Sequence, residues 1–175
     1  MKEETLKELF EKEKDDCCFF ETGTSGGKGV QRAINVGFKD IRSIELSTAL
    51  HEEAVSRFAD QSHVKLYQGS SKTLLYKFSK DIQTDIFFWL DAHYSFGRTA
   101  IDGNQICPLM EELEQIKNLS VNTHTICIDD VADIYNGYMQ VDMDEIKQKL
   151  FEINPNYDLS FVPGFDTDIL MASVR

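Results

Sequence analysis

The sequence predicts an α/β fold in which a mostly parallel, seven-stranded sheet carries helices on both faces and ends in an antiparallel hairpin. The first observation behind this prediction is the repeated alternation of short apolar segments with amphipathic helical segments along residues 17–153. The second is the nearly continuous apolar run 85–90, which is typical of a strand buried on both faces of a parallel sheet. The third is the turn pair Pro163-Gly164 between two strand-like segments, which predicts the hairpin.

The first half of the chain is expected to supply three strands and the helices that follow them. Leu6, Leu9 and Phe10 have helical spacing, so residues 5–14 should form a short helix packed on the sheet edge. Gly37 is expected to end the helix after the first strand. The predicted strands are 17–21, 42–46 and 64–68, and the predicted helices after them end near residue 36, span 49–59 and centre on 74–78.

The second half continues the alternation from the apolar strand 85–90. Pro108 fits the first turn of a helix whose Leu109, Leu113 and Ile116 face inward, while Glu111, Glu112 and Glu114 are expected to stay in water. The remaining predicted elements are a strand over 123–128, a helix over 144–153, and the hairpin strands 157–162 and 168–174. Residues 94–107 and 131–142 are expected to be irregular loops, and the first, with Tyr94, Phe96, Arg98, Asp102 and Asn104, is predicted to be a substrate-contacting lid.

Length and composition narrow the class of protein. The 175 residues fit one domain, with an N-terminal helix over 1–16 and a core over 17–175. The net charge of −12 argues against nucleic acid or an anionic membrane as the main partner. No apolar run approaches the ~20 residues of a spanning helix, so a cytoplasmic location is expected. Cys17, Cys18, Cys107 and Cys127 form no Cys-x-x-Cys pair and are expected to be free.

The glycine-rich turn between the first strand and the next helix is the main candidate for a ligand site. Open α/β sheets bind ligands at such positions, where free N–H groups at the helix start favour electron-rich groups. A P-loop needs glycine where Thr22 stands and a hydroxyl residue where Gly29 stands. The nicotinamide fingerprint needs a second glycine where Ser25 stands. The turn therefore fits neither of these phosphate-binding motifs.

The pattern Glu21-x-Gly23-x-x-x-Gly27, followed by Glu45 at the end of the second strand, resembles the first motifs of class I S-adenosylmethionine-dependent methyltransferases. The blocks Trp89–Ser95 and Ile128-Asp129-Asp130 are similar to those of the macrocin O-methyltransferase type, small-molecule enzymes that use a divalent metal. The resemblance covers nearly the whole chain from Cys17 onward. It implies a Rossmann-like three-layer sandwich.

The resemblance implies S-adenosylmethionine as the cofactor. Glu45 would accept the ribose hydroxyls, and Glu21 would hold the turn or the amino group of the cofactor. The alternative is a structural role, in which Glu21 and Glu45 only cap neighbouring helices. The cofactor-binding residues that it implies are Glu21, Gly23, Thr24, Ser25, Gly27, Glu45, Leu46, Gly69, Ser70, Ser71 and Asp91.

Three carboxylates follow the fourth and fifth strands, which should be neighbours in the sheet. Asp91, Asp129 and Asp130 would converge there, and converging like charges need a cation or protons. Their hard oxygen atoms suit Mg²⁺ or another divalent cation, which the resemblance implies would bind a substrate hydroxyl. The alternative is that these carboxylates cap helices or pair with Lys or Arg.

His93 and Asp91 are the candidate catalytic residues. His93 stands two residues after Asp91 and should point to the same side. Its position is similar to that of the general base in metal-dependent sugar O-methyltransferases, which carry an acidic residue there. His93 could instead orient a ligand or partner Asp91.

Together these features predict direct methyl transfer from S-adenosylmethionine to a small hydroxylated molecule. Two alternatives stay open: a non-catalytic module that binds a ligand or protein, and a nicotinamide-dependent oxidoreductase. Only about sixteen residues precede the first strand, so we expect an acceptor pocket that is open, completed by a partner subunit, or lost. The sequence fixes neither the acceptor nor the oligomeric state, and a homo-oligomer is one option.

Overall fold

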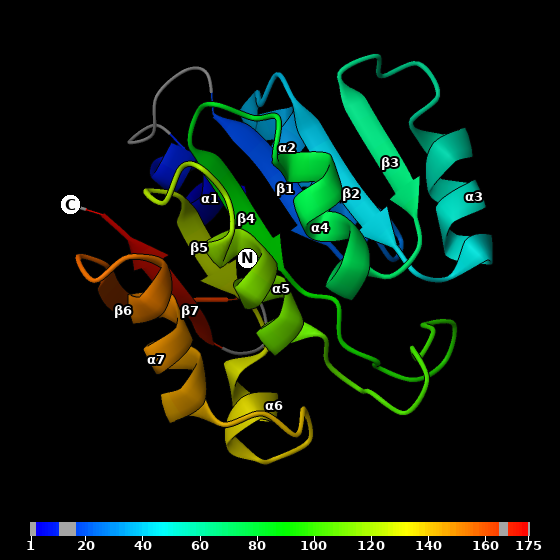
Figure 1. Cartoon of the computed structure of the whole chain (residues 1–175). Coiled ribbons are helices and arrows are strands. Elements are labelled where there is room, and N and C mark those ends of the chain that lie inside the picture. Colours follow the sequence, from blue (N-terminus) through cyan, green and yellow to red (C-terminus); the bar gives the residue numbers. More distant parts are fainter. Residues whose placement is uncertain (1–2, 11–16, 165–167, 175) are drawn as a thin grey trace.

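A computed structural model of the chain describes residues 3–10, 17–164 and 168–174. The strands in this part of the chain form one seven-stranded sheet with the order β3-β2-β1-β4-β5-β7-β6 (Figure 1). β1 to β5 run parallel, whereas β7 is antiparallel to both β5 and β6. The predicted fold class, including the terminal hairpin, is therefore confirmed. The strands are β1 (Cys18–Thr22), β2 (Ile41–Glu45), β3 (Val64–Gln68), β4 (Ile86–Leu90), β5 (Thr125–Ile128), β6 (Asp158–Pro163) and β7 (Asp168–Ser173).

Helices cover both faces of this sheet, giving three layers (Figure 1). In β1, Cys18 and Phe20 pack with apolar residues of α4, α5 and α7, whereas Phe19 packs with those of α1, α2 and α3. Alternate residues of one strand thus enter two separate cores, because successive side chains point to opposite faces. The helices are α1 (Glu3–Phe10), α2 (Lys28–Val36), α3 (Thr48–Arg57), α4 (Ser71–Ser79), α5 (Leu109–Lys117), α6 (Val131–Tyr135) and α7 (Met143–Ile153).

Three details differ from the sequence prediction. The N-terminal helix does not lie on the sheet edge: α1 packs beside α2, and its Leu6 is buried against Phe19 and Trp89. The expected loop 131–142 begins with the short helix α6, which is too brief to produce a helical repeat in the sequence. Glu112 is buried rather than solvated, because α5 lies close against α4 and turns this side chain inward.

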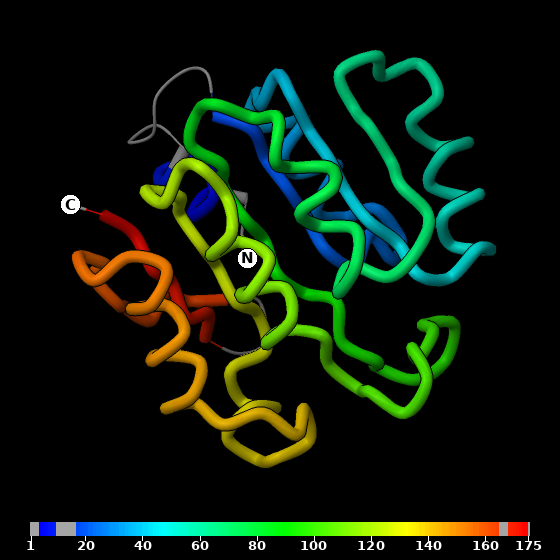
Figure 2. Tube along the Cα trace, viewed as in Figure 1, coloured from blue at the N-terminus to red at the C-terminus, as the bar shows by residue number. Residues whose placement is uncertain are grey.

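The parallel register brings the ends of the central strands to one edge of the sheet. Thr22 pairs with Leu90, and Leu90 pairs with Ile128, so the residues that follow β1, β4 and β5 emerge side by side. The chain trace in Figure 2 shows the long loop after β4 extending past these strand ends before it returns to α5. The site described below is built at this edge.

Two further expectations concern the cysteines and membrane spans. All four cysteines are free, as predicted, and all four are buried. Across residues 3–10, 17–164 and 168–174, the structure contains no helix with the length and apolar character needed to cross a membrane.

Candidate active site

A pocket of about 470 Å³ opens at the carboxyl ends of the parallel strands. Its lining combines the turn after β1, the end of β2, the start of α4 and the loop after β4. Of the predicted cofactor-binding residues, those that line it are Gly23, Ser25, Glu45, Leu46, Gly69, Ser70, Ser71 and Asp91. The pocket also contains Ala92, His93 and Asp130, so it brings the glycine turn and the acidic edge into one cavity.

Gly23 lets the turn after β1 lie directly against the chain that leaves β4. Its φ is +83°, and a Cβ at this position would collide with the backbone carbonyl of Asp91. The N–H of Gly23 donates to the carbonyl of Ile44 at 2.9 Å, which ties the same turn to β2. Only glycine accommodates both the positive φ and the close backbone approach.

Glu45 is buried, and its carboxylate organises the wall of the pocket. Oε2 accepts the N–H of Ser25 at 2.7 Å, and Oε1 accepts the N–H of Ser47 at 2.8 Å. A carboxylate oxygen can accept more than one hydrogen bond, so both atoms keep acceptor capacity toward the cavity. Glu45 therefore caps the start of α3, which is the alternative role considered for it in the sequence analysis. It also faces the pocket.

Three predicted cofactor-binding residues lie beneath the turn and do not line the pocket. The Ser43 hydroxyl donates to Glu21 Oε2 at 2.6 Å, and Thr24 Oγ1 lies 2.6 Å from the same hydroxyl. Gly27 caps α2 with a φ of +72° and faces the ring of Phe58. Glu21, Thr24 and Gly27 therefore stabilise the conformation of the glycine turn without lining the pocket.

Glu21 is a buried acid, and among residues 3–10, 17–164 and 168–174 no basic group lies at hydrogen-bond distance from it. Burial raises its pKa to about 8, and the charges of Asp91 and Glu45 add to the effect, while the hydrogen bond from Ser43 opposes it. The side chain thus holds a proton at neutral pH and supports the turn mainly as a neutral group.

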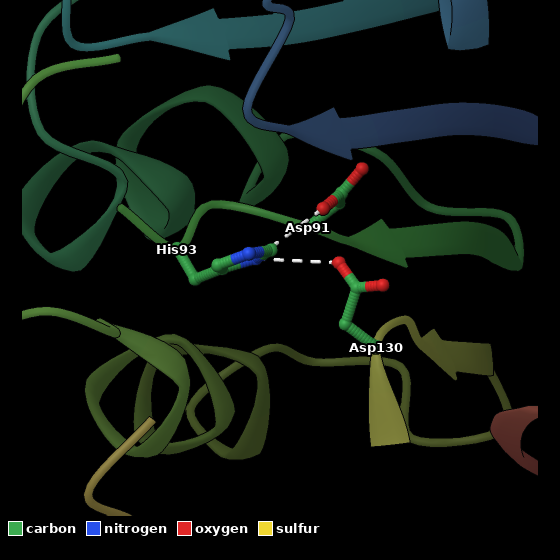
Figure 3. A group of neighbouring side chains, drawn as sticks. All are labelled: Asp91, His93 and Asp130. Carbon is green, nitrogen blue, oxygen red and sulfur yellow. Dashed lines mark ion pairs between the residues drawn. The ribbon is translucent and has the colours of Figure 1, made fainter. Parts of the chain in front are cut away.

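Asp91, His93 and Asp130 form a compact cluster on the floor of the pocket (Figure 3). His93 Nδ1 lies 3.6 Å from Asp91 Oδ1 and 3.6 Å from Asp130 Oδ2. Burial of the ring disfavours its charged form, but the carboxylates of Asp91 and Asp130 outweigh this and raise the pKa of His93. Burial and the charge of Asp91 raise the pKa of Asp130.

Asp129 does not join this cluster. Its Oδ1 accepts the N–H of Asp130 at 2.9 Å, and it borders a smaller cavity whose lining includes Glu112 and Cys107 as well as Asp91 and His93. Burial and the nearby charge of Asp91 raise the pKa of Asp129 to about 6. The sequence predicted that Asp91, Asp129 and Asp130 converge, and the structure groups the ligand atoms of Asp91, His93 and Asp130 within 4.8 Å of one another.

The divergence of Asp129 and Asp130 follows from the backbone between them. Asp130 has a φ of +53°, which turns the chain sharply at the start of α6. Two successive carboxylates therefore face different cavities. Nothing in the dipeptide itself signals this turn, since most aspartates have negative φ.

The loop over residues 94–107 forms the outer wall of the pocket through Ser95, Thr99, Ala100, Asp102, Gln105 and Ile106. Lys72 of α4 holds it with an ion pair to Asp102 at 2.8 Å, and Arg98 pairs with Glu53 of α3. Phe96, which is 64% exposed, lies beside Tyr94 and Tyr138 at the outer end. The loop is thus anchored to α4 and α3 by these two ion pairs.

Lys28 is a pocket residue that the sequence reasoning missed. It opens α2 and lines the pocket on the side of the glycine turn. Its ammonium group brings a positive charge to a cavity that otherwise contains the carboxylates of Glu45, Asp91, Asp102 and Asp130. The position of Lys28 directly after Gly27, at the start of a helix, was the signal that could have identified it.

Comparison with known proteins identifies similar solved structures but no matching sequence family. No protein-family model matches the sequence, and no curated protein matches it. The fold is similar to that of a Staphylococcus aureus protein designated a caffeoyl-CoA O-methyltransferase, with a TM-score of 0.65 and 15% identity over 98% of this chain and 82% of the other.

Two similar structures carry the cofactor or its product. The O-methyltransferase TomG from Streptomyces achromogenes, in complex with S-adenosylmethionine, has a TM-score of 0.60 and 17% identity over 98% of this chain and 78% of its own. An O-methyltransferase from Bacillus cereus in complex with S-adenosylhomocysteine has a TM-score of 0.63 and 16% identity over 99% of this chain and 80% of its own. The likeness to the macrocin type stays a prediction. At these identities the comparison establishes the fold alone, a Rossmann-like fold that this chain shares with these methyltransferases.

Proposed function

We propose that the protein is an S-adenosylmethionine-dependent O-methyltransferase that acts on a small hydroxylated molecule with the help of a divalent cation. One observation carries this proposal: a single cavity is lined both by the glycine turn with Glu45 and by the Asp91, His93 and Asp130 cluster. A methyl donor bound along the turn would therefore lie next to the groups that can hold an acceptor oxygen. S-adenosylmethionine supplies an electrophilic methyl group, which the acceptor oxygen takes by direct displacement.

The charges on the pocket wall are complementary to the parts of this cofactor. Glu45 has acceptor capacity for the two ribose hydroxyls, since each of its oxygens already accepts only one recorded backbone N–H. Lys28 can pair with the α-carboxylate of the methionine part, and Asp91 can pair with its ammonium group. The closeness of Gly23 to Asp91 would place that part of the cofactor at the junction of β1 and β4.

The cluster also fits a divalent cation. Two carboxylates and an imidazole within 4.8 Å of one another supply three ligand atoms, and like charges at this distance favour an added cation. When bound, such a cation lowers the pKa of a hydroxyl group and fixes the orientation of its oxygen. The sequence suggested that Asp91, Asp129 and Asp130 bind Mg²⁺. In this proposal Asp91 and Asp130 remain ligands of the cation.

His93 and Asp91 are the proposed catalytic groups of the chain. Asp91 and Asp130 make the imidazole hold its proton more tightly than a free histidine does, despite its burial. A general base must first lose that proton, whereas a ligand to a cation gives it up on binding. His93 therefore has two candidate roles, as base and as ligand.

The loop over residues 94–107 is proposed to contact the acceptor. It lines the pocket together with the glycine turn and is anchored through Asp102 and Arg98. A cavity of about 470 Å³ is in the range of small-molecule sites. The size of the cavity supports a small acceptor, and the loop would exclude water from the transfer.

Isothermal titration calorimetry tests this proposal. We expect S-adenosylhomocysteine and S-adenosylmethionine to bind the wild-type protein, with NADH as the comparison ligand that should not bind. Addition of Mg²⁺ or Mn²⁺ should produce a separate binding event that is lost in Asp91→Asn. Failure of both S-adenosyl compounds to bind would refute the methyltransferase assignment, and binding of NADH in their place would favour an oxidoreductase.

A further inference from the structure

We propose that His93 is a direct ligand of the cation, and that Asp91, His93 and Asp130 together select a transition-metal ion such as Mn²⁺ or Fe²⁺ over Mg²⁺. This inference depends on the proposed function only for the role of the cation, which is to bind the acceptor hydroxyl. The ligand set itself is a property of three side chains that the fold brings together from the loop after β4 and the start of α6 (Figure 3).

The distances in the cluster suit a shared ion better than direct hydrogen bonds. His93 Nδ1 lies 3.6 Å from an oxygen of each aspartate, whereas hydrogen bonds of this kind are about 2.7–3.2 Å long. Nitrogen and oxygen ligands bind such metals at roughly 2.0–2.2 Å, so two ligands of one ion are separated by about 3–3.5 Å. Both distances are therefore close to the separation of two ligands of one ion, and the ligand atoms of all three residues lie within 4.8 Å of one another.

The burial of these side chains differs in a way that suits a metal centre open on one side. The His93 side chain is only 9% exposed and directs Nδ1 between the two carboxylates, while Asp91 and Asp130 are 32% and 31% exposed. All three residues line the pocket, and Figure 3 shows Nδ1 of His93 directed toward both carboxylates. A cation bound here would therefore lie at the wall of the pocket.

The identity of the ligand atoms decides which ion is preferred. Mg²⁺ favours an all-oxygen octahedral set and retains several waters. An imidazole with two carboxylates suits Mn²⁺, Fe²⁺, Co²⁺ or Zn²⁺, and affinity for such a mixed set rises along that series of metals. Among the described residues, the group whose ligand atom lies within 4.8 Å of those of both Asp91 and Asp130 is His93, which supplies a nitrogen.

This assignment decides between the two candidate roles of His93. A nitrogen that shares its lone pair with a cation cannot also take the proton of the acceptor hydroxyl. His93 then contributes by holding the ion, and the proton of the acceptor is released through the lowered pKa of the hydroxyl itself.

The direct test is pulsed electron paramagnetic resonance of Mn²⁺ bound to the full-length wild-type protein after treatment with a chelator. We expect modulation from one coupled ¹⁴N nucleus, and we expect His93→Ala to remove it. Calorimetry on the same samples should show Mn²⁺ binding about tenfold or more tightly than Mg²⁺. His93→Ala should reduce this difference, because only oxygen ligands would be left.

The neighbouring aspartates provide a matched pair of variants. Asp130→Asn should weaken Mn²⁺ binding at least tenfold, whereas Asp129→Asn should leave it nearly unchanged, since an amide oxygen can still accept the N–H of Asp130. Circular dichroism checks that each variant is folded. The ¹⁴N measurement on the wild-type protein tests the inference even where a variant does not fold.

The possible results separate this inference from the proposed function. Bound Mn²⁺ without ¹⁴N coupling, or equal losses in Asp129→Asn and Asp130→Asn, would overturn the assignment of His93 even where S-adenosylhomocysteine binds. Absence of Mn²⁺ binding would overturn it as well. Nitrogen coupling in a protein that does not bind S-adenosylhomocysteine would support the metal site and refute the methyltransferase.

Discussion

The backbone N–H of Asp130 donates to the side-chain carboxylate of Asp129 at 2.9 Å. Asp129 borders the smaller cavity, whereas Asp130 lines the main pocket and approaches His93. The proposed cation site therefore depends on a local turn as well as on the convergence of strand ends.

Gly23→Ala should destabilise the protein and abolish ligand binding. A Cβ at residue 23 collides with the carbonyl of Asp91, and the φ of +83° strains any other residue, which together should cost roughly 2–3 kcal/mol. Urea denaturation gives the free energy of unfolding. Gly26→Ala is the matched control, because no atom lies within 4 Å of the added Cβ. Equal effects of the two substitutions would show that the turn does not have the described shape.

Glu45→Gln should weaken binding of S-adenosylhomocysteine by about tenfold or more. The substitution removes the negative charge that accepts from Ser25 and Ser47 and that is proposed to accept from the ribose. Calorimetry measures the affinity, and Glu52→Gln on the exposed side of α3 serves as the control. Unchanged affinity in Glu45→Gln would rule out the ribose contact.

Lys28→Ala should discriminate between two ligands that differ only in the amino-acid portion. S-adenosylhomocysteine has the α-carboxylate that Lys28 is proposed to bind, so its affinity should fall by roughly five- to twentyfold, about 1–2 kcal/mol. 5′-Methylthioadenosine lacks that portion, and its affinity should not change. Lys39→Ala, at an exposed site after α2, controls for the loss of a positive charge. Equal losses for both ligands would contradict the assignment.

Glu21→Gln should stabilise the protein, and more so as the pH rises. The folded-state pKa of about 8 lies above the ordinary value of 4.5, so the contribution of Glu21 to stability is most favourable below pH 4.5 and is lost as the pH rises to about 8. Glutamine does not ionise and avoids this loss, which at about 1.4 kcal/mol per pKa unit amounts to roughly 4 kcal/mol near pH 8. Urea denaturation at pH 5 and pH 8 measures the difference, which should be small at the lower pH. A gain that does not vary with pH would mean that burial does not shift this pKa.

Asp102→Asn should loosen the loop over residues 94–107. The substitution breaks the ion pair with Lys72 while leaving the pair between Arg98 and Glu53 in place. Limited trypsin digestion after Arg98 should become severalfold faster, because the loop must open locally to be cleaved. Asp81→Asn, on the exposed turn after α4, should have no effect on this rate. If cleavage is equally fast in both variants, the ion pair does not hold the loop.

Much of the architecture was predictable, because strands buried on both faces and amphipathic helices leave clear patterns. β3 was placed residue by residue, and β1, β2 and β4 to within a residue at either end. Glu45 and Gly23 were likewise found at the predicted strand ends. These features depend on periodicity and on turn chemistry, both of which are local in the sequence.

The composition of the acidic cluster was not predictable in the same way. Whether Asp129 or His93 completes the set depends on the positive φ of Asp130 and on the packing of the loop after β4. The burial of Glu112 is also a tertiary effect: it follows from the contact of α5 with α4. The charged residues of this segment predict an exposed side chain at Glu112. The contact of α5 with α4 in the folded structure is what buries it.

The burial of all four cysteines makes the native protein a poor target for thiol reagents. Burial raises the pKa of Cys107 to about 12, and the pKa of Cys18 is raised as well, so neither is a ready nucleophile at neutral pH. A thiol introduced on the surface, as in Phe96→Cys at the exposed end of the loop, would react far faster with a maleimide dye than the native cysteines. The wild-type background thus allows a fluorophore to be placed at one chosen position, from which opening of the loop can be followed in real time.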